Sequence, residues 1–202
     1  RKENRPFKEK NLPLTTPLLL STVHKRILSK IRKSIFEDKK EHFLFYEVDE
    51  ERRVEIYLQA IAESLKKNKQ VICIFPEIFS VNQFFNLCKQ RFGSERIAFW
   101  YSRLSDSLRY SIWMKVLKGE IDLIIGTRSA IFFPFSNLSL IIVDEENHPF
   151  YKQEKRPLYH LNEVARKRAK LENVTLIFGC LTPSVESYFD AKETSKLNLL
   201  KR

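Results

Sequence analysis

Apolar residues recur along this chain with two periods, one typical of helices and the other typical of buried strands. Short apolar runs rich in β-branched residues predict strands, and apolar residues three to four positions apart predict helices. The expected strands cover residues 43–48, 71–75, 97–101, 123–125, 138–143 and 174–178. The expected helices cover residues 18–36, 53–67, 81–91, 105–117 and 162–171, and a further helix begins at 185–189. Strands and helices therefore alternate from residue 43 onwards.

This alternation predicts a single α/β fold. Continuous apolar strands are typical of a parallel sheet that is covered by helices on both faces. We therefore expect a three-layer αβα domain over residues 17–190. Residues 1–16 are basic and contain prolines, and we expect a linker or arm there. The polar, Lys-rich residues 191–202 are expected to form a second linker.

Composition and charge narrow the class of partner. The chain has 202 residues, of which 43% are hydrophobic, and this allows a substantial core. The formal net charge of +11 favours nucleic acid as a partner, although a solvated basic surface would give the same value. The three cysteines are scattered and form no CxxC pair, which argues against a zinc site or a disulfide framework and favours the cytoplasm. We recognise no signal peptide and no apolar run of the roughly 20 residues that a membrane span needs, so no membrane partner is expected.

An acid-rich segment directly follows the apolar run 140–143 and suggests a nucleotide site. Asp144 and Glu145 would lie at the carboxyl edge of the parallel sheet, where open α/β folds bind ligands. In nucleoside triphosphatases, the first carboxylate of such a pair holds Mg²⁺ and the second polarises the attacking water. We therefore expect Asp144 to be the metal ligand and Glu145 to be the second catalytic residue.

A series of short motifs carries a resemblance to a known family. They include Glu55-Ile-Tyr-Leu-Gln-Ala-Ile61, Gly126-Thr-Arg-Ser-Ala130, Asp144-Glu-Glu-Asn147, Tyr151-Lys-Gln-Glu154 and Thr182-Pro-Ser184. In this order and spacing, residues 43–187 resemble the first motor domain of the primosomal protein N-prime (PriA) family of bacterial replication-restart DNA helicases. The resemblance implies a RecA-like domain of the P-loop, superfamily 2 type, followed by a second motor domain outside this chain.

The resemblance also implies ligands, partners and DNA contacts. Its ligands would be ATP, Mg²⁺ and forked or single-stranded DNA, and its partners primosome proteins and single-strand-binding protein, in a nucleoid-associated location; zinc-binding cysteines would lie outside this segment. Thr182, Pro183 and Ser184 match a motif that couples hydrolysis to domain movement. The expected DNA contacts are Pro76, Gln83, Ser102, Thr127, Arg128, Ser129, Tyr151, Lys152 and Tyr159.

The residue types at these positions suit DNA, although ordinary structural roles remain open. Hydroxyls and a guanidinium after Gly126 suit a phosphodiester backbone. The aromatic and basic residues of 148–160 suit unpaired bases and phosphates. The structural alternative for the segment after Gly126 is an ordinary surface turn. The alternative for residues 148–160 is that their aromatic rings pack on the sheet.

The phosphate-binding loop of the family, G-x-x-x-x-G-K-[ST], is absent from the sequence. By its spacing from Tyr57 it should occupy residues 47–54, which read Glu-Val-Asp-Glu-Glu-Arg-Arg-Val. Arg52 and Arg53 replace the second glycine and the lysine, so the cradle of backbone N–H groups is lost. Four acidic side chains in the same segment would repel a triphosphate. We therefore expect a loop of unchanged length whose binding of ATP and Mg²⁺ is weakened or lost.

These observations predict a DNA-binding domain for replication restart, recombination and repair, with a degenerate nucleotide site. Two alternatives remain open. An active ATP-dependent 3′-to-5′ DNA helicase would use Arg53 in place of the lysine. A protein-interaction module would keep the helicase fold and bind neither ligand.

Overall fold

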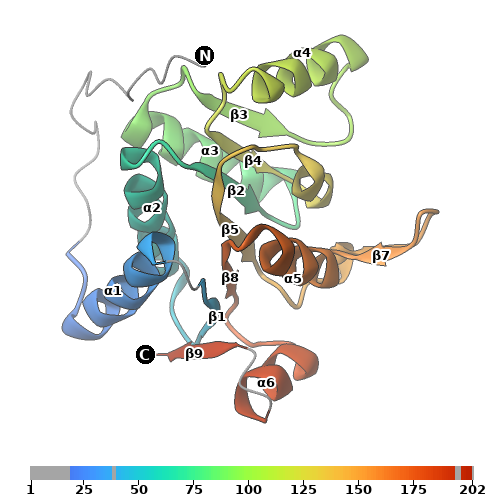
Figure 1. Ribbon diagram of the computed structural model, residues 1–202. Coiled ribbons are helices and arrows are strands. Elements are labelled where there is room, and N and C mark those ends of the chain that lie inside the picture. Colours follow the sequence, from blue (N-terminus) through green and yellow to red (C-terminus); the bar gives the residue numbers. More distant parts are fainter. Residues whose placement is uncertain (1–18, 38–39, 194–196, 202) are drawn as a thin grey trace.

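A seven-stranded sheet forms the centre of the computed structural model, which describes residues 19–37, 40–193 and 197–201 (Figure 1). The strand order is β3-β4-β2-β5-β8-β1-β9, and each neighbouring pair is parallel. The strands are β1 (His42–Tyr46), β2 (Gln70–Ile74), β3 (Ile97–Trp100), β4 (Leu123–Gly126), β5 (Leu138–Asp144), β8 (Thr175–Gly179) and β9 (Asn198–Lys201). The expected parallel α/β sheet is confirmed.

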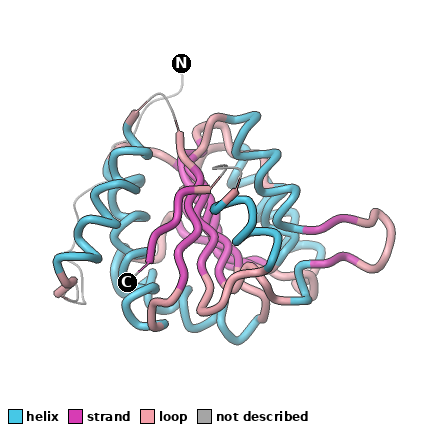
Figure 2. Tube along the Cα trace, turned by 90° about the horizontal axis from the view of Figure 1, so that it is seen from below, coloured by secondary structure: helices cyan, strands magenta, loops and turns pink. Residues whose placement is uncertain are grey.

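Helices cover both faces of this sheet and complete three layers (Figures 1 and 2). One face carries α1 (Thr22–Phe36), α2 (Glu50–Lys66) and α3 (Ile78–Phe92). The other face carries α4 (Asp106–Leu117), the short helix η1 (Arg128–Phe132), α5 (Leu161–Glu172) and α6 (Val185–Lys192). The expected αβα architecture is therefore also confirmed.

Two hydrophobic cores result from the alternation of side chains along the central strands. In β2, Val71 and Cys73 join the core beneath α1, α2 and α3, whereas Ile72 and Ile74 join the opposite core. Both sets are apolar because helices bury both faces of the sheet. This burial explains why the strands read as continuous apolar runs in the sequence.

Polar caps begin several helices at the carboxyl edge of the sheet. The side chain of Asp49 accepts a hydrogen bond from the backbone N–H of Arg52 (3.1 Å) and starts α2. Ser184 accepts one from the N–H of Ser187 (3.2 Å) and starts α6. Each cap satisfies an N–H group that the first helical turn leaves unpaired. The β1–α2 and β8–α6 connections therefore have defined conformations beside the ends of the strands.

Three segments differ from the sequence-based expectation. α2 begins three residues early, at Glu50, because Asp49 caps it. Residues 198–201 form β9, which pairs with β1, so the domain extends beyond residue 190 and this stretch is not a linker. A hairpin of β6 (Lys152–Gln153) and β7 (Tyr159–His160) projects from the body of the domain (Figure 1).

Two other expectations concern the N-terminal arm and membrane-spanning helices. The expected arm at residues 1–16 lies outside the described residues. Among the residues that are described, none of the helices combines the length and apolar character that crossing a membrane requires.

Candidate functional site

The predicted acid pair lies at the carboxyl edge of the sheet, where the sequence placed it. Asp144 is the last residue of β5, and Glu145 follows in a left-handed backbone conformation with φ of 49°. β8 separates β5 from β1 and ends opposite Asp144 at Gly179. The Asp144 carboxylate therefore lies close to the β1–α2 connection, which is where the family's phosphate loop was expected.

Arg53 lies directly against Asp144, the residue that the sequence predicted as the metal ligand. Its Nε lies 2.8 Å from Asp144 Oδ1, and its Nη2 lies 3.5 Å from Oδ2. Only 4% of the Arg53 side chain and 8% of the Asp144 side chain are exposed. Burial by itself lowers the pKa of Arg53, but Tyr57 and Asp144 outweigh it and raise that pKa. The guanidinium is therefore charged, and the two side chains form a buried ion pair.

Tyr57 donates a second hydrogen bond to the same carboxylate. Its hydroxyl lies 2.9 Å from Asp144 Oδ1. Burial raises the pKa of Tyr57 well above its ordinary value, and the charge of Asp144 adds to this, so the hydroxyl keeps its proton. Burial also raises the pKa of Asp144, and the hydrogen bonds and charge of its partners oppose that change. Asp144 is thus held by two side chains from α2.

Gly179 provides the space through which α2 reaches β5. A Cβ atom at this position would lie 1.5 Å from the Tyr57 hydroxyl oxygen and 3.2 Å from Cδ of Arg53. A side chain at residue 179 would therefore overlap Tyr57. The contact between α2 and Asp144 therefore requires a glycine at residue 179 of β8.

The β1–α2 connection does not form a phosphate cradle. Only Glu47, Val48 and Asp49 lie between β1 and α2, so the expected loop over 47–54 is wrong and its last five residues are helical. The Glu47 N–H donates to the carbonyl of Leu181 (3.2 Å), and the Arg52 N–H donates to Asp49. These two backbone donors are thus used within the chain and do not face a ligand.

Arg52 and Arg53 separate in the structure although they are adjacent in sequence. Arg52 is exposed and pairs with Asp49 on the surface, whereas Arg53 is buried. A groove of about 870 Å³ opens between α2 and α3 and reaches Asp144 and Glu145. The α2 side of this groove carries Glu50 and Glu51, whose negative charges would repel a triphosphate.

The residues present do not fit a bound Mg²⁺ ion in this arrangement. Magnesium prefers carboxylate oxygens with free lone pairs and several waters in octahedral geometry. Both Asp144 oxygens accept hydrogen bonds from side chains, and a guanidinium holds the adjacent volume. A cation and Arg53 could not occupy that volume together.

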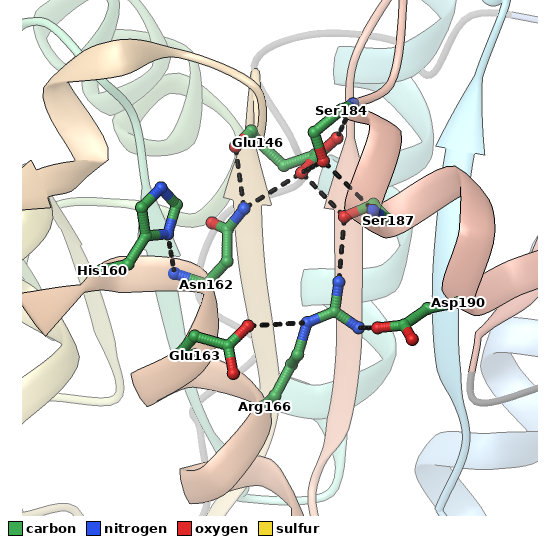
Figure 3. A network of polar contacts seen from close by, with 8 residues as sticks. All are labelled: Glu146, His160, Asn162, Glu163, Arg166, Ser184, Ser187 and Asp190. Atoms are coloured by element: carbon green, nitrogen blue, oxygen red, sulfur yellow. Dashed lines mark hydrogen bonds and ion pairs between the residues drawn. The ribbon is translucent and has the colours of Figure 1, made fainter. Parts of the chain in front are cut away.

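Glu146, to which the sequence assigned no role, forms a buried junction between several elements (Figure 3). Its carboxylate accepts hydrogen bonds from Asn162 Nδ2 (3.0 Å), from the N–H and hydroxyl of Ser184 (2.6 and 2.9 Å) and from the Ser187 hydroxyl (2.8 Å). Only 1% of Glu146 is exposed. The side chain therefore joins the acid pair to α5 and to the predicted coupling segment 182–184. The one sequence signal for it is a third acid after a buried strand.

Arg166 extends this junction on the α5 side (Figure 3). It donates to the Ser187 hydroxyl (2.9 Å) and pairs with Asp190 of α6 at 3.0 Å. The contacts of Glu146 and Arg166 hold α6 against α5. The predicted coupling residue Ser184 thus lies at the start of a helix whose position depends on Glu146.

Most of the predicted DNA contacts line one strip of the carboxyl edge. Pro76, Ser102 and Thr127 follow the ends of β2, β3 and β4, which are neighbouring strands. Ser129 also lies here, and its hydroxyl oxygen is 2.9 Å from the indole nitrogen of Trp100, from which it accepts a hydrogen bond. Gln83 lies apart from this strip, because it is exposed on α3 and lines the acidic groove instead.

Arg128 ties this strip to the projecting hairpin. Its Nη1 donates to the backbone carbonyls of Phe150 (2.6 Å) and Lys152 (2.7 Å). The ring of Tyr159, on β7, packs edge-on against Phe132 with centroids 5.4 Å apart. Arg128 therefore fixes the base of the hairpin, which is a role that the sequence reading did not include.

The structure changes the expectation for Tyr151. This residue is fully buried in η2 (Pro149–Tyr151), and its hydroxyl donates to the backbone carbonyls of Asp144 (2.5 Å) and Ile74 (3.3 Å). Its ring is not available to stack on a base in this structure. The neighbouring Phe150 is 58% exposed and provides the accessible aromatic face. Residue type alone did not distinguish the two.

Comparison with protein families gives a match that covers most of the chain. The sequence model described as DEAD/DEAH box helicase matches residues 55–185. This match begins directly after residues 47–54, where the phosphate loop is missing.

Curated relatives confirm the more specific resemblance. The replication restart protein PriA of Bacillus subtilis (strain 168) is 40% identical over 188 residues, which are 93% of this chain and 23% of that protein. The PriA protein of Chlamydia pneumoniae is 42% identical over 167 residues, 82% of this chain and 22% of that protein. The chain thus spans less than a quarter of the length of these relatives.

Solved structures share the fold at low sequence identity. RecG bound to a three-way DNA junction superposes with a TM-score of 0.66 at 20% identity, over 92% of this chain and 24% of that one. The DUF1998 helicase MrfA bound to DNA gives a TM-score of 0.64 at 13% identity, over 91% and 26%. The RecA-like fold is therefore confirmed.

Proposed function

Because this chain belongs to the DEAD/DEAH box helicase family, we propose that it serves as a DNA-binding domain of a longer replication-restart protein and that its own nucleotide site is inactive. The observation that carries the proposal is the buried Arg53–Asp144 ion pair, which stands where a motor would place its metal. The strip of the carboxyl edge beside it has accessible polar and aromatic groups.

The carboxyl-edge strip supports binding of single-stranded or forked DNA. Phe150 offers an exposed ring on which a base can stack, and Lys152 lies two residues further along the chain at the exposed base of the hairpin. Thr127 and its neighbours follow β4 and offer hydroxyl groups for phosphates. The relatives at 40 to 42% identity are replication restart proteins, and this supports the same biological role.

The same relatives are the basis of a proposal for partners and location. We propose contacts with primosome proteins and single-strand-binding protein in the bacterial cytoplasm, near the nucleoid. The support for these contacts is the sequence similarity to replication restart proteins.

Mutation of the strip is expected to weaken DNA binding. Phe150→Ala combined with Lys152→Ala should lower the affinity for a 20-nucleotide single strand by about five- to fifty-fold, because it removes one stacking surface and one phosphate contact. Fluorescence anisotropy at low salt measures this change. Phe189→Ala with Lys192→Ala is a matched control, since Phe189 is 55% exposed on α6. Equal losses in the two double variants, or no binding by the unaltered chain, would refute the DNA proposal.

Nucleotide is expected not to bind. Titration calorimetry of the chain with Mg²⁺-ATP up to 1 mM should give no binding heat, because Arg53 and Tyr57 occupy the Asp144 carboxylate. Asp144→Asn should leave that result unchanged. Micromolar binding that the Asp144→Asn variant loses would instead favour an active ATP-dependent helicase.

A further inference from the structure

The outer face of α1 carries only one sign of charge. Its inner positions Ile27, Ile31 and Ile35 are buried against the core, with 4%, 0% and 3% of their surface exposed. The helix contains neither Asp nor Glu. Its exposed positions include five cations, namely Lys25, Arg26, Lys30, Arg32 and Lys33.

A comparison with α5 shows what an ordinary solvated face looks like in this protein. α5 carries four cations, and Glu163 and Glu172 flank them on the same helix. Arg168 pairs with Glu172 at 2.9 Å, and Arg166 lies 3.8 Å from Glu163. Pairs of opposite charge one turn apart stabilise a helix, and pairs of like charge destabilise it. Two of the four cations of α5 therefore have an acidic partner on their own helix.

α1 lacks this arrangement. Within the described chain, Lys25, Arg26 and Lys30 form no ion pair. Arg26 and Lys30 are four residues apart, as are Arg166 and Lys170 of α5, but α1 has no acidic residue of its own to offset the repulsion. Arg32 does pair with Glu63 of α2, and Lys33 lies 3.5 Å from Glu37. A face that bears unpaired cations at some cost in stability is typical of a binding surface for a polyanion.

The cations of α1 continue onto the end of α2. Lys67, which directly follows α2, lies over the ring of Phe36 at 5.5 Å, and this places the ends of the two helices side by side. Lys66 is also exposed there. We name this surface the basic ridge and define it by Lys25, Arg26, Lys30, Lys33, Lys66 and Lys67. α1 packs on the sheet face opposite to α5, and both views show it on the other side of the molecule from the projecting hairpin (Figures 1 and 2).

The structure of the ridge selects among polyanions. A basic amphipathic helix that lies in a membrane surface inserts its apolar face, but the apolar face of α1 is packed inside the domain. Single strands are held largely by aromatic rings that stack on bases. Phe36 is the only Phe, Tyr or Trp in α1; it is 43% exposed with Lys67 over its ring, so the helix offers one aromatic ring against five cations. A regular phosphate backbone fits the remaining chemistry.

We propose that the basic ridge binds the sugar-phosphate backbone of double-stranded DNA, as a second surface apart from the carboxyl edge. The proposal rests on the proposed DNA-binding function and adds the duplex arm of a fork to it. Lys25 and Lys33 are separated by about 12 Å along the helix axis. This distance corresponds to roughly three or four successive phosphates of one strand.

Neutralisation of the ridge tests the proposal. The ridge variant carries Lys25→Gln, Arg26→Gln, Lys30→Gln and Lys33→Gln, and the control variant carries Lys115→Gln, Lys118→Gln, Lys167→Gln and Lys170→Gln. The control positions are exposed on α4, at its end and on α5, and both variants lose four charges. Anisotropy with a 20-base-pair duplex and a 20-nucleotide strand, across a salt series, gives affinities and salt slopes for each protein.

We expect duplex affinity to fall at least tenfold in the ridge variant and its salt slope to fall by about three, since each lost phosphate contact contributes about 0.9. The control should keep the slope, and single-strand affinity should change less than twofold in either variant. An equal duplex loss in both variants, or an unchanged duplex affinity in the ridge variant, overturns the proposal. Failure of the carboxyl-edge function gives a different result, because the variant with Phe150→Ala and Lys152→Ala would then bind the single strand as tightly as the unaltered chain.

Discussion

Replacement of Arg53 by alanine is expected to lower the free energy of unfolding by about 3 to 5 kcal/mol, because it leaves the Asp144 carboxylate buried without its charged partner. The two side chains are 4% and 8% exposed, so water cannot readily take the place of the guanidinium. In a domain of this size the loss corresponds to a decrease in Tm of roughly 6 to 20 °C. Urea denaturation followed by circular dichroism measures the change.

The neighbouring residue supplies the control. Arg52→Ala removes the same side chain one position earlier, but Arg52 is half exposed and its partner Asp49 lies at the surface. We expect no measurable shift of its unfolding midpoint, because exposed ion pairs are screened by water. The double variant Arg53→Met with Asp144→Leu should recover much of the lost stability, since neither charge is then buried. An Arg53→Ala protein as stable as Arg52→Ala would show that the buried pair does not contribute.

The second large effect is expected at Glu146. Glu146→Ala should lower the free energy of unfolding by about 2 to 4 kcal/mol, because buried donors on Asn162 and Ser187 and part-buried donors on Ser184 lose their common acceptor. Hydrogen exchange should also become faster at the backbone amides of α6, since Glu146 holds the start of that helix. Both measurements use the same purified chain.

Glu145 is the matched position for this experiment. It precedes Glu146 directly and is exposed, so Glu145→Gln should leave both stability and the exchange of α6 nearly unchanged. Glu146→Gln retains the shape of the side chain but turns an amide group toward hydrogen-bond donors, and we expect an intermediate loss. A uniform increase in exchange across all helices of the Glu146→Ala protein would argue against a local role for this residue.

The layered fold could be read from the sequence because its determinants are local. Buried β-branched runs such as 140–143 predicted the parallel strands, and the acid residues after that run lie at the carboxyl edge as expected. β9 was missed because Leu197, Leu199 and Leu200 lie in a short, Lys-rich stretch, and pairing of this edge strand with β1 supplies what the local pattern lacks. Strand identity there depends on a partner more than 150 residues away.

The chemistry of the candidate site was harder to predict because it depends on distant contacts. Arg53 looked like a replacement for the phosphate-binding lysine, but it meets Asp144, which lies 91 residues further along the chain. Tyr151 was expected to stack on DNA, and only the tertiary structure shows that it is buried while Phe150 is exposed. Glu146 stood in the recognised acid segment without a role, because its partners come from α5 and α6.

The contact between α2 and β5 also bears on how such a domain could respond to its surroundings. In a motor, two elements move apart or together when a ligand enters or leaves the space between them. The ligand can drive this movement because it binds one of the two conformations more tightly than the other. Here Arg53 and Tyr57 bridge the same elements with side chains that are always present. Because these side chains belong to the chain itself, no change in the concentration of a ligand can add or remove this contact. We therefore expect the contact between α2 and β5 to act as a fixed platform whose geometry does not change with nucleotide.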